Sequence, residues 1–120
     1  MADRVQFIEH RGKRVLLIDF SRCGRDEMME VLSDVQETIA AEPRDSVLVM
    51  ADFTDATIDK AVATRIKEAL VLDRPYVRRS YWVGTEHLPK VYYENFKIFS
   101  QRNFPTFKTR AEALDWLVAD

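Results

Sequence analysis

The sequence has few of the residues that cross-link or interrupt a chain. It contains one cysteine, three glycines and four prolines in 120 residues. The lone Cys23 has no second thiol with which to form a disulfide within the chain, which fits a reducing compartment. The shortage of glycine and proline excludes fibrous and low-complexity classes. With 47% hydrophobic and 32% charged residues, the composition predicts one globular domain spanning residues 1–120.

Long apolar runs and an excess of one charge are also missing. No stretch approaches the roughly 18 apolar residues that a membrane span needs, and the opening MADRVQFIEH lacks the apolar core of a signal peptide. Eighteen basic residues against 20 acidic ones leave a net charge of -2, so the protein has no strong field for a phosphate backbone. We expect a cytoplasmic protein with no membrane span and no nucleic-acid partner.

Five segments carry the patterns of strands. Residues 4–10 alternate in polarity, residues 14–20 are nearly continuously apolar, and Gly12 between them suits a turn with positive φ, which predicts a β-hairpin. The alternating strand is expected toward a sheet edge and the apolar one deeper inside. Turn residues bound the other strands, expected at 46–52, at 76–84 and, as a short edge strand because of Pro105, at 104–108.

Four segments carry the 3.6-residue periodicity of helices. The first, 25–42, has a stripe of Met29, Leu32, Val35, Gln36 and Ile39. The second, 58–73, has a stripe of Ile58, Ala61, Val62, Ile66, Ala69 and Leu70. Helices are also expected at 88–101 and at 109–120, the latter with Thr109 and Glu112 in capping-box spacing. The order β-β-α-β-α-β-α-β-α predicts an α/β fold whose mixed sheet is parallel through its centre.

That order, together with VQFIEHRGKRVLLIDFS at the start, DFTDAT before the second helix, RPYVRRSYWVG and the terminal TRAEALDWL, resembles a known group. It is similar to the SpoIIAA-like branch of the STAS family, the domain shared by sulfate transporters and anti-sigma-factor antagonists. In antagonists, a Ser or Thr in the loop after the third strand is phosphorylated by a partner kinase, and the phosphate selects the bound protein. The resemblance therefore implies Thr54 and Thr57 as possible phosphoacceptors, flanked by Asp52 and Asp55.

The residues themselves point to the same place. Parallel strands bring their carboxyl ends to one edge of a sheet, where open α/β sheets usually bind ligands. Three predicted strand ends contribute the expected ligand or partner rim: Asp19, Ser21, Arg22, Asp52, Asp55, Thr85 and His87. The structural alternative is that Asp55 or Thr57 caps the second helix while Thr54 braces the turn.

No pattern in the chain favours catalysis. Cys23 and His87 lie in no nucleophile motif, and the spacings of Asp52, Asp55 and His87 match no common metal site. We therefore expect a non-enzymatic protein with no cofactor and no metal.

The segment 88–101 is richer in aromatic residues than a solvent-facing helix needs. Tyr92, Phe96 and Phe99 are expected to pack in the core, to seal a homodimer or to line an apolar pocket. Two functions follow from these sites. The first is a regulatory or protein-interaction domain that uses the 52–57 loop, and the alternative is a protein that binds a small lipid-like molecule beneath the aromatic helix.

Overall fold

The computed structural model describes residues 4–85, 94, 106–107 and 109–119, and these residues form five strands and three helices. In chain order they are β1 (Val5–His10), β2 (Lys13–Asp19), α1 (Arg25–Ala40), β3 (Val47–Asp52), α2 (Lys60–Asp73), β4 (Val77–Val83), β5 (Thr106–Phe107) and α4 (Arg110–Leu117). Each of these elements was predicted from the sequence. Apart from residue 94, the helix expected over 88–101 lies outside the described residues, together with His87, Tyr92, Phe96 and Phe99.

The strands form one mixed sheet in the order β1-β2-β3-β4-β5. β1 and β2 are an antiparallel hairpin, and β2 to β5 run parallel. The hairpin turn has positive φ at Arg11 and Gly12, as expected for the glycine. The mixed sheet with a parallel centre, the alternating first strand at the edge and the apolar second strand inside are thus confirmed.

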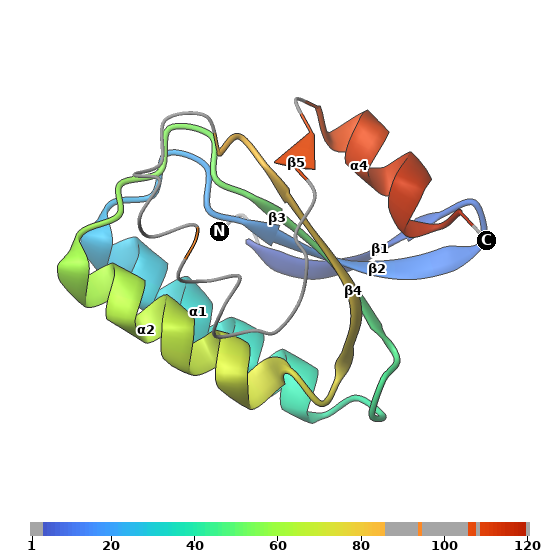
Figure 1. Ribbon diagram of the computed structural model, residues 1–120, viewed down its shortest axis with the longest axis horizontal. Helices are drawn as coiled ribbons and strands as arrows, with labels where there is room; N and C mark the ends of the chain where they lie inside the picture. Colours follow the sequence, from blue (N-terminus) through green and yellow to red (C-terminus); the bar gives the residue numbers. More distant parts are fainter. Residues whose placement is uncertain (1–3, 86–93, 95–105, 108, 120) are drawn as a thin grey trace.

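Helices cover both faces of this sheet. α1 and α2 lie side by side on one face, and α4 lies on the other (Figure 1). β2 shows why its sequence is continuously apolar: Leu16 and Ile18 join the core under α1 and α2, whereas Val15 and Leu17 join the core under α4. Among the described residues, no helix has the length and apolar character that crossing a bilayer requires.

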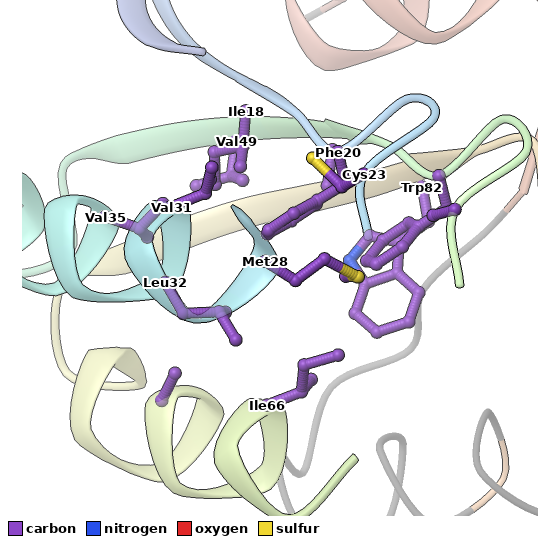
Figure 2. Packing of buried hydrophobic residues seen from close by; sticks show 14 of the residues in the cluster. Ile18, Phe20, Cys23, Met28, Val31, Leu32, Val35, Val49, Ile66 and Trp82 are labelled. Atoms are coloured by element: carbon purple, nitrogen blue, oxygen red, sulfur yellow. The ribbon is translucent and has the colours of Figure 1, made fainter. Parts of the chain in front are cut away.

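The core-facing side of α1 differs from the expected stripe. Met28, Val31, Leu32, Val35 and Ile39 are buried, and Figure 2 shows several of them packed toward Ile18 and Val49 of the sheet. Met29 is only partly buried. Gln36 is not a core residue, because it lies beside the buried stripe and its Oε1 accepts a hydrogen bond of 2.7 Å from Arg65 of α2.

Two helix boundaries also differ from the prediction. α1 ends at Ala40, two residues before the expected end, and α2 begins at Lys60 instead of residue 58. The N-cap of α2 is Asp59, whose Oδ1 accepts a 2.8 Å hydrogen bond from the Val62 N–H. The expectation that Asp55 or Thr57 caps this helix was therefore wrong, whereas Thr109 caps α4 as predicted, at 3.2 Å from the Glu112 N–H.

Candidate functional site

The loops that follow β2 and β3 lie side by side at one end of the sheet (Figure 1). The Arg22 N–H donates to the Thr54 carbonyl at 2.9 Å, and the Phe53 N–H donates to the Val83 carbonyl at the end of β4 at 2.8 Å. These bonds extend the parallel ladder beyond the strands and hold the three strand ends together. The rim predicted from the strand ends is therefore formed by its first two loops.

Each of these two loops begins with the same turn. Asp19 Oδ1 accepts hydrogen bonds from the Ser21 N–H at 2.9 Å and from Ser21 Oγ at 2.5 Å. Asp52 Oδ1 accepts the equivalent bonds from the Thr54 N–H at 2.9 Å and from Thr54 Oγ1 at 2.6 Å. Asp19 and Asp52 are also direct partners in the β2–β3 register. The segments DFS and DFT thus form paired Asx-type turns on neighbouring strands.

The backbone of the two turns stays equivalent in the next residues. Arg22 and Asp55 both have positive φ, 58° and 55°, and both side chains are exposed. The N–H groups of Cys23 and Ala56 then donate back to the phenylalanine carbonyl of each loop, at 3.1 and 3.0 Å. Each loop is therefore held in one conformation by its own hydrogen bonds.

Aromatic packing fixes the inner side of the rim. The rings of Phe20 and Phe53, which follow the two aspartates, stack with their centroids 4.9 Å apart. The Phe53 ring also contacts that of Trp82 on β4 at 4.7 Å. All three side chains are buried in the core under α1 and α2. The polar turns are therefore adjacent to a packed aromatic cluster.

Arg110, in the first turn of α4, joins the two turns. Its Nε donates to Asp52 Oδ2 at 2.8 Å, and its Nη2 lies 3.4 Å from Asp19 Oδ1. Sequence reasoning missed this residue. The available signal was a cation in the first turn of a helix, where the macrodipole disfavours positive charge unless a carboxylate is near.

The contacts of Asp52 set its ionisation. The side chain is 7% exposed, and burial tends to raise the pKa of its carboxyl. The hydrogen bonds from Thr54 and the Arg110 guanidinium outweigh this effect and hold the pKa of Asp52 below its usual value. Asp52 is therefore a charged structural acceptor at neutral pH and a poor general base.

Removing the Arg110 guanidinium should weaken the attachment of α4. We expect Arg110→Met to lower the free energy of unfolding by about 1–2 kcal/mol at neutral pH, since Asp52 keeps its bonds from Thr54 and Arg110 is partly exposed. The loss should shrink as the pH falls through the lowered pKa of Asp52, where the carboxylate becomes protonated. Urea unfolding measured across acidic to neutral pH checks this, with Arg110→Lys as the control that keeps the charge. An equal loss at every pH would contradict it.

The two threonines of the 52–57 loop differ in their surroundings. Thr54 braces its turn, as the structural alternative held, and its hydroxyl is committed to Asp52. Thr57 is exposed, and its N–H donates to the Cys23 carbonyl at 3.1 Å. Within the described part of the chain, the Thr57 hydroxyl makes no hydrogen bond.

The remaining rim residues contribute less. Thr85 is partly buried after Gly84, and His87 lies outside the described residues. Cys23 is 1% exposed, and burial raises the pKa of its thiol, which leaves little thiolate to act as a nucleophile. Among the described residues, no group of three His, Cys, Asp or Glu side chains is placed to hold a metal ion.

Comparisons with known proteins were made by family, by sequence and by structure. No family model, curated protein or solved structure matches this chain.

Proposed function

We propose that this protein is a non-enzymatic, cytoplasmic regulatory domain resembling the STAS family, and that it binds a protein partner through the surface of residues 52–57. The observation that carries the proposal is the exposed residue Thr57, whose hydroxyl makes no hydrogen bond within the described residues and whose backbone N–H is bonded to Cys23. Hydrogen bonds hold the loop on both sides of it, so a change at this side chain alters the surface without altering the fold.

Thr57 is the better phosphoacceptor of the two threonines. Phosphorylation of Thr54 would remove the proton that its hydroxyl donates to Asp52 Oδ1 at 2.6 Å, and it would add negative charge beside that carboxylate. At Thr57, by contrast, no hydrogen bond within the described residues is lost. Arg25 lies near the N-terminus of α2, since its Nε is 3.4 Å from Asp59 Oδ2, and we expect it to pair with a phosphate added at Thr57.

The lipid-like alternative has less support. An apolar cavity lies between α1, α2 and the sheet, but its volume is about 60 Å³. An engineered apolar cavity that takes up benzene measures about 150 Å³. This space is smaller than a lipid-like molecule needs. The aromatic segment proposed to cover such a ligand lies outside the described residues, so the alternative stays a prediction.

The proposal is tested by adding a negative charge at position 57. We expect Thr57→Glu to change the amount of at least one host protein captured by the tagged domain by about tenfold, which corresponds to roughly 1.4 kcal/mol of binding free energy. The exposed site should leave the free energy of unfolding within about 0.5 kcal/mol of the wild type. Quantitative mass spectrometry of the captured proteins and urea unfolding supply the two measurements.

Two variants serve as controls. Thr57→Val removes the hydroxyl without adding charge and should behave as the unphosphorylated protein. Thr54→Val should lower stability by about 1 kcal/mol, because Asp52 loses one donor, and it measures the structural role of the Thr54 hydroxyl separately from Thr57. Identical capture by wild type, Thr57→Glu and Thr57→Val would refute the proposal.

A further inference from the structure

A buried carboxyl group of α2 has no hydrogen-bonding partner in the part of the chain that the structure describes. Asp73 is 8% exposed, and its side chain makes no hydrogen bond or ion pair within the described residues. It continues the buried stripe of Val62, Ile66 and Ala69, so the helix periodicity directs it to the core. It is also the last residue of α2, where the helix macrodipole disfavours a negative charge.

Asp73 lines the cavity between α1, α2 and the sheet. Figure 2 shows two of the apolar side chains that line this cavity, Leu32 of α1 and Ile66 of α2. Ser80 of β4 is 7% exposed and lines the same cavity. The register of β3 and β4 shifts between Val47 and Leu48, and this irregularity places Ser80 on the same face as Val77.

The lining selects one class of ligand. A metal ion is unsuitable, because hard cations need about six oxygen ligands and the lining is mainly apolar. An anion would be repelled by the Asp73 carboxylate. A primary ammonium group has three donors and no acceptor, which suits a carboxylate and a hydroxyl oxygen, and a short alkyl chain suits the apolar walls.

We propose that this cavity binds a short primary alkylammonium ion, with Asp73 and Ser80 accepting hydrogen bonds from its head group. The volume of about 60 Å³ limits the ligand to roughly two to four non-hydrogen atoms, by comparison with the space that one water or one benzene molecule occupies in a protein cavity. Ethylammonium, with three such atoms, is the matching probe.

Two cations near the site oppose a cationic ligand and limit its affinity. Arg65 interacts with Asp73 through space, but its guanidinium is hydrogen-bonded to Gln36. Arg74 also lines the cavity. Burial raises the pKa of Asp73 to about 7 in spite of Arg65, so the carboxylate form that pairs with an ammonium group predominates only in mildly basic solution.

The experiment is a titration of the full chain with ethylammonium chloride at about pH 8. Binding is monitored through the amide chemical shifts in NMR spectra. Saturable shifts are expected at residues lining the cavity, with affinity about tenfold tighter than for ethanol, which has the same shape and no charge. A control titration with ammonium chloride at equal ionic strength measures the chemical-shift changes caused by salt and by the head group without the alkyl chain. Binding should weaken as the pH is lowered below 7, because Asp73 becomes protonated.

Two variants separate the head-group contact from the cavity. Asp73→Asn keeps the shape and should bind ethylammonium no better than ethanol. Ala69→Leu fills part of the cavity and keeps the carboxyl, and it should abolish binding of both compounds. Equal binding of ethanol and ethylammonium by the wild type, or unchanged binding by a folded Asp73→Asn protein, would overturn the proposal. An absence of saturable shifts in the wild type would overturn it as well.

Discussion

Replacing Gly84 by alanine is expected to destabilise the protein by about 2–4 kcal/mol. Gly84 has φ of 74°, a conformation that costs a residue with a Cβ about 1 kcal/mol. A Cβ at this position would also lie 2.6 Å from the Thr54 N and 2.8 Å from the Thr54 Cα. These are backbone atoms, so relief requires the loops after β3 and β4 to separate.

The same movement should disturb the rim. It would strain the 2.8 Å bond from the Phe53 N–H to the Val83 carbonyl and the turn in which Thr54 contacts Asp52. Unfolding in urea measures the loss of stability. Amide exchange at residues 52–57 should increase more than exchange in α1, because the contact is local.

Gly12 offers a matched control for this prediction. Its φ is 79°, close to that of Gly84, but no atom lies within 4 Å of a Cβ built there. Gly12→Ala should therefore cost only the backbone strain, about 1 kcal/mol. Equal losses in the two variants would show that the contact with Thr54 is not what requires glycine at position 84.

Replacing Asp73 by asparagine is expected to stabilise the protein by roughly 2–3 kcal/mol above pH 7. Burial raises the pKa of Asp73 from 3.8 to about 7, because the charged form loses hydration and gains no hydrogen bond from the described residues in return. Between these values the folded protein holds a proton that the unfolded chain has released. The contribution of Asp73 to stability therefore falls as the pH rises from about 4 to 7, by at most roughly 4 kcal/mol.

Asparagine removes the titration but still buries a polar amide, so the expected gain is smaller than this limit. The gain should disappear near pH 4, where Asp73 is neutral in both states. Urea unfolding of both proteins across this range tests the prediction, with Asp34→Asn on the exposed side of α1 as the control. A gain that does not depend on pH would contradict the assigned cause.

Local patterns predicted most of the described fold. The alternation in 4–10, the continuous apolar run in 14–20 and the capping box at Thr109 each specify an element through neighbouring residues alone. The errors lie where side chains from distant segments compete. Gln36 was counted in the stripe of the first helix because its position fits the period, but it is only partly buried and its amide bonds to Arg65, 29 residues further along.

The candidate site was also predicted only in part, because some of its contacts join segments that are distant in the sequence. Asp19, Ser21, Asp52 and Thr54 follow strands whose parallel arrangement could be expected, so their convergence at one edge was foreseeable. Their pairing with Arg110 was not, because it depends on how α4 docks 58 residues beyond Asp52. The cap of α2 was placed too early because several residues before the helix have suitable side chains, and the one that caps it, Asp59, has extended backbone directly before the first helical residue.

The sequence by itself determined the identity and order of the described elements and the faces of the sheet that are buried, since these depend on periodicity and turn residues within a few positions. Only the tertiary structure decided that Arg110 bridges two carboxylates and that the Thr54 hydroxyl bonds to Asp52. It also decided that Asp73 lines a cavity without a hydrogen-bonding partner among the described residues. Each of these depends on the positions of atoms brought together by packing, and hydrogen bonds form or fail within a few tenths of an ångström.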